Sequence, residues 1–376
     1  MLFSDLGYGT LKRFPAFDPP EYVDWTPDLE VMDRFREAIE ADLERREMVA
    51  ELTPEQHLQL YKGLVRNRLH DIALKRWVRQ GVTSKAWLGT GEEAATVGAV
   101  HALKPGDVLG PMIRNAGACH EMGMSVTEMF RAYLATGDSP TKGRDIHFGD
   151  MERGVLAPIS MVGALVPVCA GVALAFKQRK ESRLALTWAG DGSTRTTAFH
   201  EGVMCARALR LPVIVVVQDN QIALGTRLAS HSRRPMSELA TIYDVTGMTC
   251  DGNHVLDVYA TVRLAADMCR GGRGPVMVTM HTFRMGGHAT HDEGESRAIL
   301  PPELFEEWGR RDPIGMYEAY LTDAGFNLSS DKSNRQALED AEADVSAEIE
   351  KAEEEALASR DSSVPNPETQ QLGVLA

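Results

Sequence analysis

Positive charge is scarce in this sequence of 376 residues: 40 lysines and arginines stand against 54 aspartates and glutamates, a net charge of −14. We therefore expect neither nucleic acid nor an anionic membrane surface as a partner, because binding to phosphate groups needs clustered Lys and Arg side chains. Cysteine is also scarce. The five cysteines are odd in number, lack close spacing and mostly lie in apolar surroundings, which is typical of reduced core residues and favours a cytoplasmic location.

Targeting and membrane signals are missing as well. The first residues contain no basic segment leading into an apolar run, so no secretory signal is expected, and no lipidation signature is found. Residues 154–176 carry no charge over 23 positions, long enough to span a bilayer. Pro158, Pro167, the glycines and the lack of flanking Trp or Tyr instead favour a buried loop that enters a core helix.

Residues 184–226 contain a strand, a helix and a second strand. The apolar segments 184–189 and 212–217 predict neighbouring strands of a parallel sheet, and the second is apolar throughout, as in strands buried on both faces. Between them, Phe199, Val203 and Ala206 recur at helical spacing. A right-handed crossover of this kind places the loops after both strands at one edge of the sheet.

Oxygen-bearing side chains follow these two strands. Gly190-Asp191-Gly192 comes after the first, and Asn220 follows the second, 29 positions after Asp191. Open α/β sheets bind ligands at this edge. Carboxylate and amide oxygens suit Mg²⁺, and glycines allow the backbone to approach a diphosphate closely. The sequence thus predicts a site for a metal and a diphosphate.

This spaced motif resembles the signature of the thiamine-diphosphate enzymes. Further motifs narrow the resemblance to the alpha subunit of 2-oxo acid dehydrogenases: Gly91-Glu92-Glu93-Ala94, an arginine in the next loop, Gly143-Arg144 and His147-Phe148-Gly149. The resemblance implies a three-layer α/β fold with a mostly parallel central sheet flanked by helices. We assign this domain to residues 53–325, preceded by an N-terminal arm and a charged helix (1–52) and followed by an acidic helix and a tail (326–376).

The resemblance also implies roles for particular residues. The metal ligands would be Asp191, Asn220 and the backbone carbonyl of Ile222. The residues expected to contact the cofactor are Arg114, Val162, Asp191, Gly192, Ser193, Asn220, Arg284 and His288. His288 would also be catalytic, close to the reacting carbon. Two departures stand out: Ile113 replaces a tyrosine expected to contact the diphosphate, and Ala289 and His291 replace hydroxyl residues that are phosphorylated in some relatives.

The implied activity is oxidative decarboxylation of a 2-oxo acid, with thiamine diphosphate and Mg²⁺ as cofactors and transfer of the acyl unit to a lipoyl group on an acyltransferase. The chain has room for only the diphosphate-binding half of the site, so a beta subunit would supply the other half in an α2β2 heterotetramer. Branched-chain substrates are preferred, and pyruvate or acetoin enzymes are the alternatives.

Two other functions stay open. A regulatory or structural subunit that binds thiamine diphosphate without catalysis is supported by Ile113. A metallohydrolase is possible if His288, His291 and Asp292 bind Zn²⁺ on one helix face. Gly286 and Gly287 disfavour such a helix.

Overall fold

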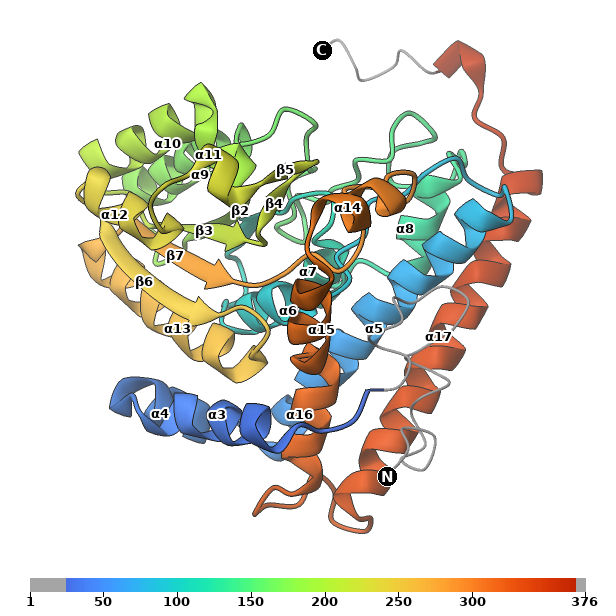
Figure 1. Ribbon diagram of the computed structural model, residues 1–376. Coiled ribbons are helices and arrows are strands. Elements are labelled where there is room, and N and C mark those ends of the chain that lie inside the picture. Colours follow the sequence, from blue (N-terminus) through green and yellow to red (C-terminus); the bar gives the residue numbers. More distant parts are fainter. Residues whose placement is uncertain (1–24, 370–376) are drawn as a thin grey trace.

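The computed structural model describes residues 25–369, and a five-stranded sheet organises them (Figure 1). The strand order is β1 (Val108–Gly110), β2 (Ala185–Gly190), β3 (Val213–Asp219), β7 (Val276–His281) and β6 (Thr246–Asp251). Every neighbouring pair is parallel. Strands β2 and β3 pair directly, and α10 (Thr197–Ala208) connects them. The prediction of a strand, helix and parallel strand is confirmed.

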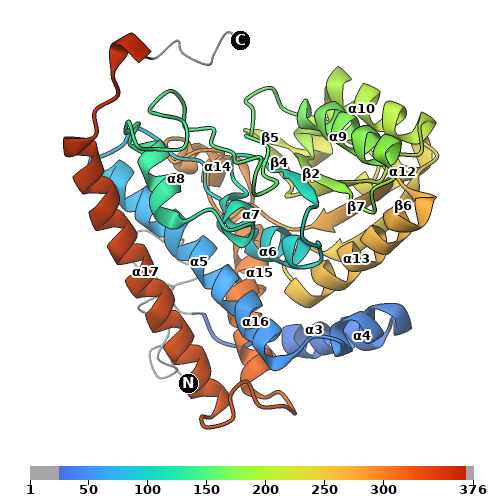
Figure 2. The same cartoon turned by 180° about the vertical axis from the view of Figure 1, so that it is seen from behind.

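Helices cover both faces of the sheet, as the apolar segment 212–217 predicts. Side chains alternate between faces along a strand, and Val213, Val215 and Val217 join the apolar cluster that contains residues of α9 (Leu165–Arg179) and α10. Ile214 and Val216 join the cluster that contains residues of α6 (Glu93–His101) and α13 (Val255–Met268). Figures 1 and 2 show these two helix layers on opposite sides of the sheet. The predicted three-layer α/β fold is confirmed.

Two long helices flank the domain. Helix α5 (Pro54–Arg79) begins with a capping box formed by Thr53 and Gln56. Helix α17 (Asn334–Ser362) lies alongside it in both views. The acidic helix expected near the C-terminus is thus present, and an apolar stripe on it is buried against the protein's own helices. The members of the stripe are Leu338, Ala341, Val345, Ile349 and Ala352.

Shorter elements complete the described residues. The other α-helices are α3 (Leu29–Glu40), α4 (Leu43–Ala50), α7 (Ala116–Glu121), α8 (Val126–Tyr133), α11 (Leu228–His231), α12 (Leu239–Ile242), α14 (Glu293–Ile299), α15 (Pro302–Arg310) and α16 (Pro313–Thr322). Strands β4 (Ile222–Ala223) and β5 (Thr226–Arg227) form a small antiparallel pair. Single-turn elements are η2 (Gly192–Arg195), η3 (Met236–Glu238), η4 (Cys269–Arg273) and η5 (Pro367–Thr369).

The structure describes only part of the N-terminal arm and charged helix predicted for residues 1–52. Most of the expected arm, residues 1–24, lies outside the described residues, but the side chain of Trp25 is buried against Gly315 and donates a hydrogen bond to the carbonyl of Arg310. The charged segment that follows forms two helices, α3 and α4. The side chain of Asp42 accepts a hydrogen bond from the backbone N–H of Arg45, and this cap begins the second helix.

The loop before α9 differs from its prediction. It was expected to be buried, yet Ile159, Met161 and Val162 are exposed. Side chains of Met161 and Val162 are therefore not part of the core. Of the cysteines, Cys205 is exposed and the other four are buried, all of them free. Among residues 25–369, no helix is long and apolar enough to cross a membrane.

Candidate functional site

The carboxyl ends of four parallel strands surround a cavity of about 520 Å³. Arg114 follows β1, Asp191 follows β2, Asn220 follows β3 and Arg284 follows β7. All residues singled out from the sequence as cofactor or metal contacts line this one cavity: Arg114, Val162, Asp191, Gly192, Ser193, Asn220, Ile222, Arg284 and His288. Ile113 lines it too.

Asp191 and Asn220 are both buried in the wall of the cavity. Burial raises the pKa of Asp191, and the Nε2 atom of His231 lies 3.2 Å from its Oδ2 atom. The Oδ1 atom of Asn220 is buried and has no hydrogen-bond partner within the described chain. Burying an acceptor oxygen without a partner costs free energy, unless a bound ligand or ion interacts with it.

The oxygen atoms near Asn220 suit a hard cation. The carbonyl of Ile222 accepts a hydrogen bond from Nη1 of Arg284 at 3.2 Å and has a second lone pair for another partner. A Cβ atom placed on Gly192 would lie only 2.6 Å from that of Ala223, so the close approach of these two segments requires glycine. One carboxylate, one amide oxygen and one carbonyl thus form a donor set that fits Mg²⁺.

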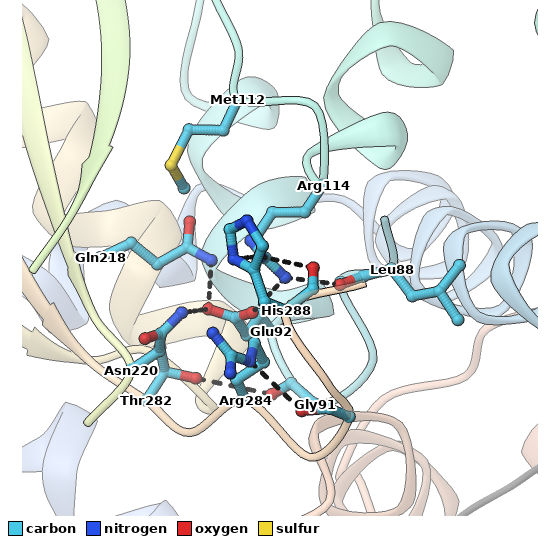
Figure 3. A network of polar contacts seen from close by, with 12 residues as sticks. Leu88, Gly91, Glu92, Met112, Arg114, Gln218, Asn220, Thr282, Arg284 and His288 are labelled. Carbon is cyan, nitrogen blue, oxygen red and sulfur yellow. Dashed lines mark hydrogen bonds and ion pairs between the residues drawn. The ribbon is translucent and has the colours of Figure 1, made fainter. Parts of the chain in front are cut away.

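Two buried guanidinium groups supply positive charge beside these oxygens (Figure 3). Arg114 donates to the carbonyl of Leu88 at 2.7 Å, and Arg284 donates to the carbonyl of Leu224 at 2.9 Å. Burial and the neighbouring Arg114 lower the pKa of Arg284 to about 10, which leaves it charged at neutral pH. Because backbone contacts fix both groups before a ligand arrives, they form a prepared site for an anion such as a diphosphate.

His288 lies against Arg114, with 3.3 Å between its Nδ1 atom and Nη2 of the arginine. Since a guanidinium can only donate, Nδ1 accepts, and a neutral imidazole then carries its proton on Nε2. Burial, Arg114 and Arg284 lower the pKa of His288 to about 4, so the ring is neutral near pH 7. His288 can therefore donate or exchange a proton through Nε2.

The zinc hypothesis does not fit this loop. Helix α14 begins at Glu293, after the three candidate ligands, so His288, His291 and Asp292 do not share a helix face. The Asp292 carboxylate accepts a hydrogen bond from the Ala289 backbone. No cluster of three or more His, Cys, Asp or Glu side chains suited to a metal ion occurs in the part of the chain that the structure describes.

Sequence reasoning missed several residues of the site. Glu92 served only as part of a motif, but it is fully buried and its Oε1 atom accepts hydrogen bonds from Nε2 of Gln218 at 2.5 Å and Nδ2 of Asn220 at 2.9 Å (Figure 3). A charged residue directly before a helix of small apolar residues was the available signal. His231 comes from a polar loop in which nothing distinguished it.

The chain is similar to known proteins over most of its length. Residues 61–360 match the family model described as "Dehydrogenase E1 component". The chain belongs to this family. It is 29% identical over 308 residues to the pyruvate dehydrogenase E1 component subunit alpha of Acholeplasma laidlawii, covering 81% of this chain and 86% of that one. A Staphylococcus aureus protein of the same name is 29% identical over 329 residues, covering 86% and 84%.

A second kind of relative is equally similar. The 2-oxoisovalerate dehydrogenase subunit alpha of Bacillus subtilis is 29% identical over 318 residues, covering 83% of this chain and 95% of that one. The predicted membership of the 2-oxo acid dehydrogenases, as an alpha-type subunit, is therefore confirmed. At this identity the comparisons do not separate pyruvate from branched-chain substrates.

Proposed function

We propose that this E1 alpha subunit binds thiamine diphosphate through Mg²⁺ at the carboxyl ends of β1, β2, β3 and β7. The observation that carries the proposal is the convergence in one cavity of Asp191, the unpartnered oxygen of Asn220 and the two buried arginines. Asp191, Asn220 and the carbonyl of Ile222 would hold the metal ion. Arg114 and Arg284 would hold the diphosphate.

When bound, thiamine diphosphate supplies the carbanion that attacks a 2-oxo acid and allows CO₂ to leave. This chain orients the cofactor, neutralises its diphosphate and presents His288 at the cavity wall. Because its Nδ1 atom is occupied by Arg114, the imidazole is fixed with Nε2 available for proton transfer to the reacting substrate.

A beta-type subunit completes the site in our proposal. Asp191 is the only carboxylate among the described residues that line the cavity, so no second carboxylate is available to activate the aminopyrimidine. Met161 and Val162 on the rim are 67% and 54% exposed, and Val168 on the adjoining helix is 44% exposed. Exposed apolar side chains grouped around a site are typical of a surface that binds another protein. In the α2β2 assembly, the acyl unit would pass to the lipoyl group of an acyltransferase.

The preferred substrate class is a branched-chain 2-oxo acid. Much of the lining that this chain contributes is apolar and bulky, including Trp87, Met112, Ile159 and Leu165. Such walls favour an aliphatic side chain over the methyl group of pyruvate, since each buried methylene contributes roughly 0.8 kcal/mol.

The test is an assay of decarboxylation by the chain alone and by the chain co-purified with its beta-type partner, with thiamine diphosphate and Mg²⁺. We expect activity only in the pair, with kcat/KM about tenfold or more higher for 3-methyl-2-oxobutanoate than for pyruvate, as the two extra buried carbon atoms of its side chain predict. Activity of the chain alone would contradict the need for a partner. A preference for pyruvate would contradict the substrate class but not the cofactor site.

A further inference from the structure

Glu92 occupies an unusual position for a carboxylate. It immediately precedes α6, its side chain is fully buried, and it does not line the cavity. Its Oε1 atom accepts hydrogen bonds from two side-chain amides, those of Gln218 within β3 and Asn220 just after it. Burying a carboxylate is costly, so a residue held in this way is expected to have a role that offsets the cost.

The hydrogen bond from Asn220 Nδ2 to Glu92 decides how the Asn220 amide is turned. A carboxylate can only accept, so the NH₂ group of Asn220 must face Glu92 and its Oδ1 atom must face the other way. That Oδ1 atom is the buried oxygen without a partner. In Figure 3 the dashed line from Glu92 meets the amide nitrogen, and the amide oxygen lies on the far side.

We propose that Glu92 is a positioning residue, which locks the Asn220 amide so that its oxygen, not its NH₂ group, is presented to the divalent cation. The inference rests on the proposed function and extends it by one residue that does not touch the metal. Without Glu92, the amide could rotate and offer NH₂, which no cation binds. Removing an outer partner of a metal ligand typically costs about 10- to 100-fold in metal affinity.

A role in charge balance explains the geometry less well. The nearest basic group is Nη1 of Arg114, 3.8 Å from Oε2, beyond hydrogen-bond distance. The Oε2 atom has no hydrogen-bond partner in the described chain. Both hydrogen bonds of the Glu92 side chain are accepted from amide NH₂ groups. The position of Glu92 therefore fits a role in orienting these amides.

A conservative variant separates the two roles, because glutamine keeps an acceptor oxygen and loses the charge. The orientation of Gln218 is fixed independently, since its Oε1 atom accepts from Nδ2 of Asn115 at 3.1 Å. Its NH₂ group must therefore still face residue 92. In Glu92→Gln, the new side chain satisfies both neighbours only by turning its oxygen toward them, which keeps Asn220 in place.

The experiment titrates Mn²⁺ into the assembled alpha and beta subunits at saturating thiamine diphosphate, with free Mn²⁺ measured by electron paramagnetic resonance. We expect Glu92→Leu to weaken Mn²⁺ binding about 10- to 100-fold and Glu92→Gln to stay within about threefold of wild type. If leucine prevents assembly, Glu92→Ala removes the same acceptor without added bulk and carries the same expectation.

Gln218→Leu is the matched control, because it disturbs the same buried network but leaves the bond between Glu92 and Asn220. It should retain wild-type Mn²⁺ affinity within about threefold. Equal losses in Gln218→Leu and Glu92→Leu, or wild-type affinity in Glu92→Leu and Glu92→Ala, would overturn the role of Glu92. Wild-type subunits that bind no Mn²⁺ with thiamine diphosphate present would contradict the proposed function itself.

Discussion

Replacing Ile113 by tyrosine should tighten the binding of thiamine diphosphate. Ile113 lines the cavity next to Arg114 in the loop after β1, where the family resemblance leads us to expect a tyrosine that contacts the diphosphate. Isoleucine has no hydrogen-bond donor, whereas a tyrosine hydroxyl can donate to a phosphate oxygen. The backbone contacts of Arg114 hold the loop in place, so the new ring enters an existing wall.

The size of the effect follows from the type of bond. A hydrogen bond to a charged group contributes about 1.5 to 3 kcal/mol, which corresponds to about 10- to 150-fold in the dissociation constant. The larger ring also adds apolar contact that has nothing to do with the hydroxyl. Ile113→Phe is the control for this contact, because it adds the ring without the donor. The difference in binding free energy between the tyrosine and phenylalanine variants then measures the hydrogen bond alone.

Trp87 and Trp188 line the same cavity, so intrinsic fluorescence can follow the titration. Apo wild type and both variants, each assembled with the beta-type subunit, would be titrated with thiamine diphosphate at fixed Mg²⁺. The order of affinity should be tyrosine above phenylalanine, with wild type below tyrosine. Equal affinity of the tyrosine and phenylalanine variants, or weaker binding of both than wild type, would refute the placement of residue 113 at the diphosphate.

Four further outcomes are expected. Asp191→Ala should abolish Mg²⁺-dependent cofactor binding while the circular dichroism spectrum is unchanged, and unaltered affinity in calorimetry would remove Asp191 from the metal site. His288→Ala should lower kcat by about 100-fold or more with little change in cofactor affinity, whereas a parallel loss of both would mark it as a phosphate ligand. Arg68 is fully buried between the carboxylates of Glu93 and Asp312, so Arg68→Met should lower the free energy of unfolding by about 3 to 5 kcal/mol in urea titrations; a change under about 1 kcal/mol would contradict this. Burial raises the pKa of Asp71 from 3.8 to about 7, so its stabilising contribution is complete below pH 3.8 and is lost as the pH rises through about 7. In Asp71→Asn, the free energy of unfolding should therefore decrease less than in wild type between pH 3.8 and about 7. The same pH dependence in wild type and variant would contradict this role of Asp71.

Local patterns were enough to predict two neighbouring strands of the sheet, β2 and β3, and the residues that follow them at its edge. Residues 213–217 of β3 are all apolar because both faces of the strand are covered, and this property can be read from the sequence alone. Residues that follow parallel strands directly, such as Asp191 and Asn220, are brought to one edge by the right-handed crossover. Their convergence therefore depends on chain connectivity, which the sequence states directly.

Surface exposure was harder to predict. Met161 and Val162 have apolar side chains and were expected in a buried loop, but the fold leaves them exposed at the rim of the cavity. Hydrophobicity reports that a side chain favours burial, and it does not say whether its own chain or a partner provides the cover. The zinc hypothesis had a related weakness, because the spacing of His288 and Asp292 matters only if the segment is helical.

The sequence by itself determined the strand, helix and strand of residues 184–226 and the family to which the chain belongs, because each depends on residues close together or on a recognisable motif. Only the tertiary structure decided that Glu92 accepts a hydrogen bond from Asn220 and that Arg114 donates one to Nδ1 of His288. It also decided that the side-chain oxygen Oδ1 of Asn220 is left without a partner among the described residues. The partners in these contacts are more than 100 positions apart. The direction in which an amide or imidazole is turned depends on neighbours in all three dimensions, and no periodicity in a sequence encodes that direction.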